Sequence, residues 1–349
     1  MSFEEIIGLK NLLFAWNEFK RGKQKKQDVQ LFFLDLEDHL FQLHDDLVQG
    51  VYCHSPYVSF YVRDPKLRHI HKPAVRDRIL HHALVRAIEP LFERYFIFNS
   101  YSSRKNKGTH AAILKLRRLA WRVSKNNTKT VWMLHCDVRK FFDSVDHNIL
   151  LHLIQQRIGD KKVLELIEKI VRSYHAKPGK GIPLGNLTSQ LFSNIYLNEL
   201  DQFITKTMGI QDYIRYYIRY ADDIVIVARD KIFLEHFTAM IQDFLCSRLQ
   251  LALHPKKIVL RKWHQGVDFL GYVSFPHYTI LRTNTKRRLL KRLKIKYDKL
   301  NHGLMENEAF RQSLQSYLGV LSHCCGYGIK QKIKRIIYLE LSIEHLFTK

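Results

Sequence analysis

The sequence predicts an α+β fold. Short apolar and β-branched runs typical of strands stand among longer segments whose apolar residues recur at helical spacing. The two kinds of segment do not alternate regularly, which disfavours a doubly wound parallel sheet. With 349 residues, 46% of them apolar and 12% aromatic, the chain is long enough for two or three packed units and has an ordinary globular composition.

The first 56 residues are predicted to be a helical extension. The apolar positions recur at helical intervals, namely at Leu31, Leu34, Leu36, Leu40, Phe41 and Leu47. The charged segment 21–28 is expected to separate two helices. Residues 57–62, YVSFYV, alternate in the manner of a strand, and a basic turn then leads to a second extended segment that ends at Pro73.

A helix is predicted over 76–96, with a break near Pro90. A polar, basic loop follows, and an amphipathic helix begins near Thr109. The apolar run 130–138, TVWMLHCDV, predicts a strand. Residues 144–158 predict a helix, for which Asp143 or Ser144 would serve as the N-cap.

The second half of the chain opens with a helix over 163–174, and the loop 179–190, GKGIPLGNLTSQ, leads into another. Residues 217–229, YIRYADDIVIVAR, are interpreted as two short strands that meet at a turn. A helix over 233–250 and a strand or hairpin over 266–275 come next. The remainder is expected to be helical and basic.

The charge of the chain indicates a polyanionic partner. Lys and Arg number 57 against 33 Asp and Glu, which gives a formal charge of +24. Nucleic acid is the simplest such partner, and an anionic membrane surface is the alternative, although no stretch reaches the length of a membrane span and we expect no membrane association.

The cysteines and the N-terminus indicate a cytosolic protein. The five cysteines are odd in number and unpatterned, which disfavours a disulfide framework, and no second ligand pair gives Cys324-Cys325 a zinc-like spacing. The acidic N-terminus lacks the apolar core of a signal peptide. We therefore expect a cytoplasmic location.

Three aspartates are the strongest candidates for chemistry. Asp137 should end a buried strand, and Asp222 and Asp223 stand side by side where two strands meet. Neighbours on a strand point to opposite faces, but a tight turn allows both carboxylates to converge. If these segments adjoin, the repulsion among three carboxylates calls for Mg²⁺, and two ions would form a clamp for phosphoryl transfer. The alternative is a solvated hairpin turn, in which Asp is common.

Several blocks of this sequence, taken in order, resemble those of reverse transcriptases. RYADDIVIV resembles the catalytic hairpin, HCDVRKFFDSVDH the first palm motif, and GIPLGNLTSQLFSNIYLNELD the loop and helix under template and nucleotide. LHPKKI and DFLGY resemble the later palm motifs, and RHIHKPAVRDRILHHAL and SYSSRKNKGTHAAI resemble finger motifs. The resemblance implies a right-hand polymerase fold: an N-terminal extension over 1–56, fingers and palm over 57–275, and a basic helical thumb over 276–349. It also implies deoxynucleotides, template RNA and a cDNA/RNA hybrid as ligands.

The loop motif narrows the resemblance. Leu184-Gly185 and Ser189-Gln190 stand where most bacterial members carry glutamine–glycine and serine–proline. This form is similar to reverse transcriptases of diversity-generating retroelements, which are bacterial or phage-encoded. It implies adenine-mutagenic cDNA copied from a template-repeat RNA, and a small basic helical accessory protein as partner. Alternatives are a group II intron-like or antiphage-defence reverse transcriptase, and a non-catalytic RNA-binding scaffold. Because 276–349 is too short for an RNase H or endonuclease domain, we expect partners to supply such activities.

The resemblance also assigns roles to single residues. The catalytic residues are Asp137, Asp222 and Asp223, and the same three with Val138 are the metal ligands. The nucleotide-binding residues are Lys66, Arg68, Phe142, Leu184, Gly185, Gln190 and Lys257. The template- or primer-binding residues are Arg76, Arg104, Phe269, Leu270, Gly271, Arg288, Arg292 and Lys296.

Most of these assignments have a structural alternative. Phe142 is either a gate against the 2′-hydroxyl or a core aromatic residue. Lys66 and Arg68 either bind the triphosphate or are solvated loop charges. Lys257 either donates a proton to pyrophosphate or is a surface lysine without a catalytic role. Gly271 either permits close approach of the primer or ends a strand.

The basic segment 282–299 and the acidic pair at 143 and 146 complete the interpretation. Apolar residues at 289, 290, 293, 297 and 300 would bury one side of a helix. The other side would present Arg288, Arg292 and Lys296 to a nucleic-acid duplex. The alternative is that these three basic side chains are only solvated. Asp143 and Asp146 are interpreted as helix caps rather than as metal ligands.

Overall fold

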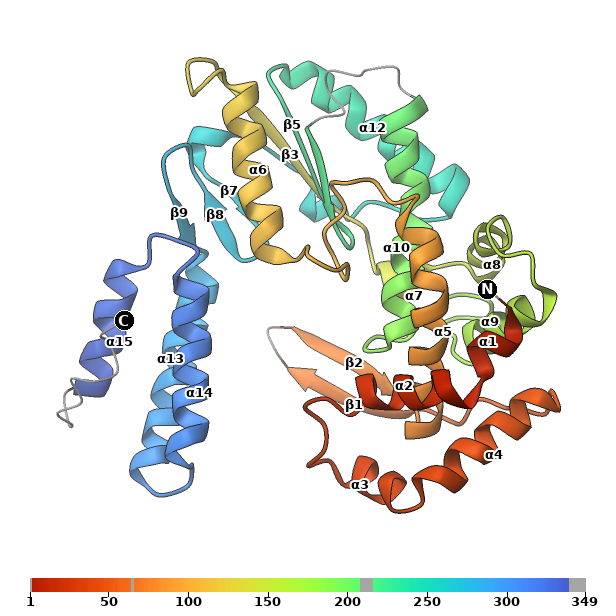
Figure 1. Cartoon of the computed structure of the whole chain (residues 1–349). Helices are drawn as coiled ribbons and strands as arrows, with labels where there is room; N and C mark the ends of the chain where they lie inside the picture. The colour runs from red at the N-terminus through yellow and green to blue at the C-terminus, as the bar shows by residue number, and fades with distance from the viewer. Residues whose placement is uncertain (1, 64–65, 208–215, 339–349) are drawn as a thin grey trace.

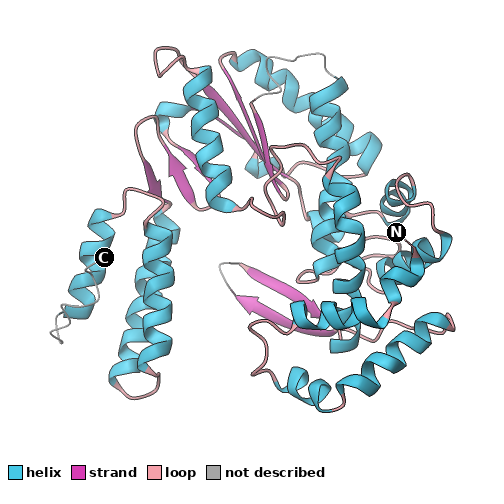
Figure 2. Cartoon of the chain, viewed as in Figure 1, coloured by secondary structure: helices cyan, strands magenta, loops and turns pink. Residues whose placement is uncertain are grey.

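The computed structural model describes residues 2–63, 66–207 and 216–338 of the 349-residue chain. The described residues form helices and three antiparallel sheets, with the N-terminal helices on one side and the C-terminal helices on the other (Figures 1 and 2). The expected α+β class is confirmed. In the described residues, no helix is both long and apolar enough to cross a membrane.

Four helices form the N-terminal extension. They are α1 (Phe3–Ile7), α2 (Leu9–Phe19), α3 (Gln27–Leu34) and α4 (Leu36–Val48). Their buried residues join the core around α5 (Val75–Glu93). The predicted apolar face between 31 and 47 is only partly buried, because non-helical backbone at Asp35 separates α3 from α4. Leu31, Leu34 and Phe41 are left 58%, 75% and 52% exposed.

The next elements are a hairpin and a long helix. Strands β1 (Val58–Arg63) and β2 (Leu67–Lys72) pair antiparallel, with Val58 opposite Lys72. Helix α5 runs through Pro90, so the expected break there is wrong. Pro90 lies in the last turn, where it removes one hydrogen bond, and the buried side chains of Ile88 and Phe92 anchor the helix on both sides of it.

A four-stranded antiparallel sheet forms the centre of the molecule, in the order β4-β5-β3-β6. The strands are β3 (Trp132–Asp137), β4 (Tyr217–Tyr220), β5 (Asp223–Ala228) and β6 (Val259–Lys262). Alternate residues enter different cores: Leu134 and Ile224 join the N-terminal cluster, whereas Met133 and Val225 join the C-terminal one.

Helices cover both faces of this sheet (Figure 1). Helix α6 (Thr109–Val123) contributes to the same core as Met133, and α10 (Leu187–Gln202) and α12 (Lys231–Leu249) contribute to the core that holds Leu134. A π-helical turn (Phe203–Thr207) extends α10. Short 3₁₀ turns, Pro255–Lys257 and Trp263–Gln265, flank β6.

Three helices follow β3 in the chain: α7 (Phe141–Ser144), α8 (His147–Gln155) and α9 (Lys161–Arg172). The residue that caps α8 is Asp146, whose side chain accepts hydrogen bonds from the amides of Asn148 and Ile149. Asp143 and Ser144 do not cap it, because both lie within the single turn of α7.

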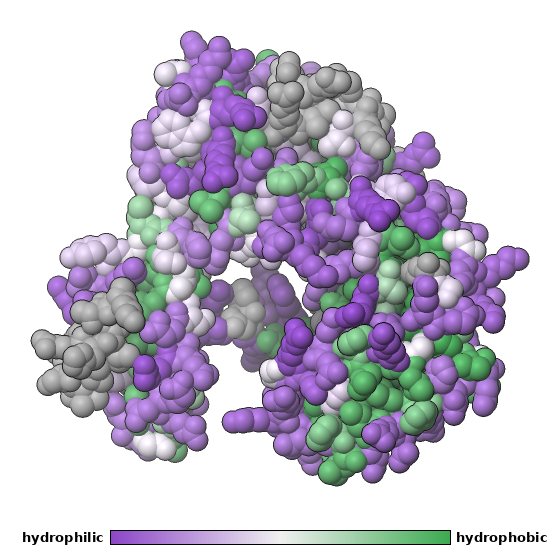
Figure 3. Space-filling model, in the orientation of Figure 1, coloured by the Kyte–Doolittle hydropathy of each residue, from purple (hydrophilic) through white to green (hydrophobic). Residues whose placement is uncertain are grey.

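The C-terminal part consists of a small sheet and three helices. Strands β7 (Val267–Phe269), β8 (Tyr272–Ser274) and β9 (Thr279–Leu281) form a meander, whose third strand was not predicted. Helices α13 (Thr283–Asn301), α14 (Asn307–Leu321) and α15 (Tyr327–Tyr338) follow. On the face shown in Figure 3 the surface is hollowed between these helices and the rest of the molecule.

Candidate active site

Strand register brings the three predicted aspartates to one end of the central sheet. Asp137, the last residue of β3, lies directly opposite Asp223, the first residue of β5. Asp222 precedes it in the tight turn from β4, where Ala221 has φ +52°. The amide of Val138 donates to the carbonyl of Asp222 at 3.4 Å, which ties the end of β3 to this turn.

The surroundings of Asp222 alter the titration of its carboxyl group. Burial, followed by the charges of Asp223 and Asp137, raises the pKa of Asp222 to about 6. Two basic side chains contact the other carboxylates. Lys257 Nζ lies 2.6 Å from Asp137 Oδ1, and His135 Nε2 lies 3.1 Å from Asp223 Oδ1.

A cleft of about 470 Å³ adjoins these carboxylates. It is bordered by residues from the β1–β2 hairpin, the central sheet and the β7–β8 turn. Of the predicted site residues, it brings together Lys66, Asp137, Asp223, Lys257, Leu270 and Gly271. These come from segments far apart in the sequence, so the cleft is a product of the tertiary fold.

Five polar residues of the cleft were not predicted: His135, Lys256, Arg261, Asp268 and Arg282. Arg282 Nε contacts Asp268 Oδ2 at 2.7 Å, while burial raises the pKa of the Asp268 carboxyl. Two weak signals were available in the sequence. A histidine stood in an apolar strand, and an acidic residue stood directly before the FLGY block.

The chemistry of the three carboxylates suits a hard divalent cation. The raised pKa of Asp222 means that negative charge is poorly compensated at this point, which a cation would correct. Across the described residues, no group of three or more His, Cys, Asp or Glu side chains already forms a metal-binding set. The side chain of Val138 has no ligating atom, so only its backbone carbonyl could be a ligand.

Three residues predicted to contact nucleic acid have partners within the protein. Arg104 is 5% exposed in its side chain and donates to Glu93 and to the carbonyls of Ile97 and Ser100. Arg76 pairs with Asp46 of α4. Phe269, 1% exposed, packs edge-on against the ring of His135. Arg104 and Phe269 are thus largely buried, whereas Arg76, on helix α5, keeps part of its side chain exposed. The nucleic-acid roles of all three stay predictions.

The predicted nucleotide-binding loop lies against β2, outside the lining of the carboxylate cleft. Leu184 is half-buried, and its carbonyl accepts a hydrogen bond from the amide of His71 at 3.4 Å. Gly185 has φ +102°, and a Cβ there would lie 3.2 Å from Ile70 Cγ2, so this glycine is required. With exposed Gln190 it borders a second cavity of about 400 Å³ that also includes residues of α2 and α5.

Arg68 and Phe142 also lie outside the lining of the carboxylate cleft. Arg68 is exposed on β2, and Phe142 is half-buried, with its ring centroid 5.6 Å from that of Phe141. The two remaining roles, phosphate contact and sugar gate, stay predictions.

Helix α13 presents two basic faces. The inner face, Arg288, Arg292 and Lys296, is half-buried, and Lys296 Nζ donates to Ser313 Oγ of α14 at 2.6 Å. The outer face, Arg287, Lys291 and Lys294, is exposed. The inner face borders the packed stripe Leu289, Leu293 and Tyr297, and its contact with a duplex stays a prediction.

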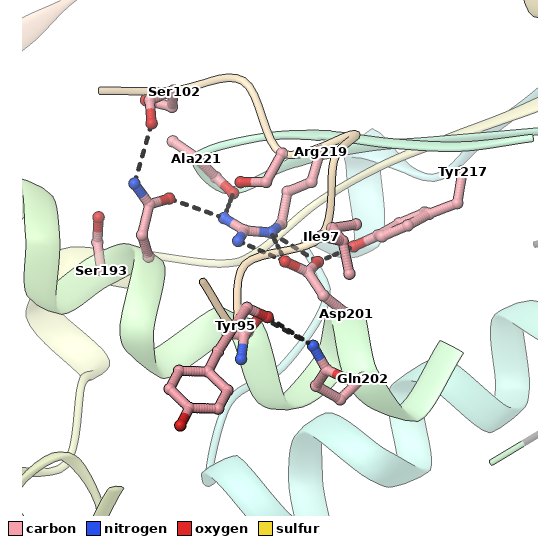
Figure 4. A network of polar contacts seen from close by, with 12 residues as sticks. Tyr95, Ile97, Ser102, Ser193, Asp201, Gln202, Tyr217, Arg219 and Ala221 are labelled. Atoms are coloured by element: carbon pink, nitrogen blue, oxygen red, sulfur yellow. Dashed lines mark hydrogen bonds and ion pairs between the residues drawn. The ribbon is translucent and has the colours of Figure 1, made fainter. Parts of the chain in front are cut away.

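Next to the turn between β4 and β5 lies a buried polar network that the sequence did not predict (Figure 4). Arg219 and Asp201 are both 0% exposed in their side chains, with Nη2 and Oδ2 2.6 Å apart. Tyr217 donates to the same carboxylate at 2.7 Å. The available signal was an arginine within the otherwise apolar strand YIRY.

Comparison with known proteins identifies relatives of this arrangement. Residues 63–274, more than half of the chain, match the family model described as reverse transcriptase (RNA-dependent DNA polymerase). A telomerase structure from Candida tropicalis superposes with a TM-score of 0.53 at 12% identity, covering 81% of this chain and 59% of that one. This likeness, together with the family match, confirms the expected right-hand polymerase fold.

The sequence relatives include bacterial and intron-encoded proteins. Protein YkfC of Escherichia coli is 28% identical over 66% of this chain and 69% of its own length. The group II intron-encoded protein LtrA of Lactococcus lactis is 28% identical over 48% of this chain and 28% of its own length. A putative COX1/OXI3 intron 2 protein of Saccharomyces cerevisiae is 22% identical, and the match spans 38% of its length. The chain thus spans well under half of the intron proteins that it matches.

Proposed function

This chain belongs to the reverse transcriptase family, and on that premise we propose that it extends a DNA primer along an RNA template, with deoxynucleotides as substrates. The observation that carries the proposal is the convergence of Asp137, Asp222 and Asp223 beside a cleft that also receives Lys66 and Lys257. Catalysis would rest on positioning and charge compensation, without a protein nucleophile.

The carboxylates, Lys66 and Lys257 would have separate roles in the proposed reaction. The three carboxylates would hold Mg²⁺, which when bound would lower the pKa of the primer hydroxyl and offset charge on pyrophosphate. Lys66 carries a positive charge from the hairpin to the cleft, where it would bind the triphosphate. The ammonium group of Lys257 lies beside Asp137 and would donate a proton to the departing pyrophosphate.

Primer extension on a defined RNA–DNA hybrid tests this function. Wild-type protein should extend the primer with Mg²⁺ and deoxynucleotides, and Asp137→Asn and Asp222→Asn should abolish extension while leaving the fold intact. Asp243→Asn, which removes an exposed carboxylate of α12, is the matched control. Equal extension by Asp222→Asn and wild type would show that these carboxylates do not form the active site.

At the finer level we propose a diversity-generating role, in which cDNA of a template-repeat RNA carries errors at adenines. The support is the LG…SQ loop: half-buried Leu184 offers shape but lacks an amide that could hydrogen-bond to a nucleotide. Leu184→Gln should lower the adenine error frequency in sequenced cDNA. An unchanged adenine error frequency would show that Leu184 does not cause the errors at adenines.

A group II intron-like function is the second candidate, because LtrA and the yeast intron protein are among the relatives. It predicts faithful copying and activity on intron RNA. The diversity-generating function predicts copying of a neighbouring noncoding RNA with errors at adenines. It also predicts dependence on a small basic helical accessory protein. Copying each RNA with and without that partner, followed by sequencing, separates the two.

A further inference from the structure

The turn that carries Asp222 and Asp223 rests on the guanidinium group of Arg219, which does not line the cleft and to which the RYADDIVIV resemblance assigns no role. Arg219 belongs to β4, two residues before Ala221. Its side chain is completely buried, whereas an arginine on a strand next to an active site would ordinarily reach solvent or substrate. Its function must therefore be exerted inside the protein.

The guanidinium binds a helix and the turn simultaneously. Nε and Nη2 hold the Asp201 carboxylate of α10 in a two-armed contact, at 2.8 and 2.6 Å. Nη1 donates to Asn194 Oδ1 and to the carbonyl of Ala221, both at 3.2 Å. Figure 4 shows the group between the helix and the turn. Only the planar fork of arginine can make these contacts in one plane.

The contact with Ala221 falls on the most strained residue of the turn. Ala221 has φ +52°, in the left-handed region that a residue with a Cβ rarely adopts. Asp222 and Asp223 follow it directly, so its backbone conformation decides where their carboxylates lie. A bond to its carbonyl from a rigid, buried donor supports this conformation.

The same strand is anchored to the loop 97–104 on its other side. The Arg219 amide donates to Asn99 O at 3.0 Å, and Tyr101 N donates to Arg219 O at 2.9 Å. Asn194 Nδ2 donates to Ser102 O at 2.9 Å. Buried Arg104 in turn holds this loop through the carbonyls of Ile97 and Ser100.

We propose that Arg219, clamped by Asp201, is a positioning residue that sets the turn geometry on which Asp222 and Asp223 depend. The clamp acts on the rate of the chemical step and not on substrate affinity, because it touches neither nucleotide nor template. The inference rests on the proposed polymerase function for its kinetic readout, and hydrogen exchange supplies a readout that does not need activity.

The test separates positioning from stability. A buried ion pair can often be replaced by apolar residues with little loss of stability, so the double variant Arg219→Met/Asp201→Leu should still fold, although Tyr217 and Asn194 lose hydrogen-bond partners. Arg219→Lys keeps the positive charge but loses the planar guanidinium group. This variant replaces the double variant in the test if the double variant does not fold. Tyr217→Phe is the matched control, because it removes one bond to Asp201 and leaves the contact with Ala221.

We expect kcat for single-nucleotide addition to fall about a hundred-fold in both arginine variants, with KM for the deoxynucleotide unchanged. Hydrogen exchange over residues 219–224 should be faster in both, and wild-type-like in Tyr217→Phe. A folded arginine variant with wild-type kcat and exchange would overturn the proposal. If wild-type protein extends no primer, the polymerase function fails, and exchange alone decides whether the clamp holds the turn.

Discussion

Removing the charge of Asp222 should stabilise the metal-free protein. The folded state raises the pKa of this carboxyl from 3.8 to about 6, through burial and the charges of Asp223 and Asp137. A difference of that size corresponds to about 3 kcal/mol. Asp222→Asn keeps the shape of the side chain and abolishes its ionisation, so the variant should gain up to this free energy of unfolding.

The sign of the effect determines its pH dependence. Below 3.8 the carboxyl is protonated in both folded and unfolded chains, and the wild type pays no cost for it. Between 3.8 and about 6 the unfolded chain ionises first, so wild-type stability falls as pH rises. The advantage of Asp222→Asn should therefore appear in this window and level off at about 3 kcal/mol above it.

Urea unfolding in the presence of a chelator, followed by circular dichroism between pH 4 and pH 8, measures this difference. Glu235→Gln on α12, an exposed carboxylate paired with Lys231, controls for loss of one negative charge from a basic protein. Adding Mg²⁺ should stabilise the wild type and not Asp222→Asn. A variant that is no more stable than wild type at pH 8 would refute the claim that burial and the neighbouring carboxylates raise the pKa of Asp222 in the folded chain.

Three further predictions concern the cleft, the loop motif and helix α13. Lys257→Met should lower the single-turnover extension rate roughly 10²- to 10⁴-fold, whereas Lys256→Met should not; equal losses would mean that the cleft needs only positive charge. Gly185→Ala should cost about 1–2 kcal/mol in thermal unfolding, because of its positive φ and its contact with Ile70, and an unchanged Tm would contradict this. Changing the whole outer face of α13 to Gln should reduce the slope of log K against log salt by about 2 in hybrid binding, more than changing the inner face.

The local sequence predicted the central strands and the catalytic turn well. A mostly apolar run, YIRYA, precedes Asp222 and Asp223, and a uniformly apolar run, IVIVA, follows them, which favours two strands and a tight turn. It missed β6, whose four residues include two cations and show no apolar run. It also missed the break at Asp35, because helical periodicity continues across it in the sequence while the backbone does not.

The candidate site was predictable only where its residues lie within motifs. Asp137 and Asp223 could be placed together from strand pairing, but Arg104 could not be recognised as an interior residue from its polar, basic loop. Its partner Glu93 lies in a separate helix, and no local pattern links the two. The same applies to Asp201 and Arg219, which meet only when α10 packs beneath β4.

The two basic contacts explain how a carboxylate triad can fold before a cation binds. Lys257 and His135 lie beside Asp137 and Asp223, whereas Asp222 feels Lys257 only as its weakest influence. The repulsion is therefore least compensated at Asp222, which follows Ala221 in the turn. The resulting destabilisation of the folded chain is local to this residue. A cation held by these carboxylates would offset this repulsion and would compete with Lys257 for Asp137, and the ammonium group of Lys257 would then be free to enter the cleft. Lys257, which contacts Asp137 in the metal-free protein, would in that way become available to bind a substrate in the cleft.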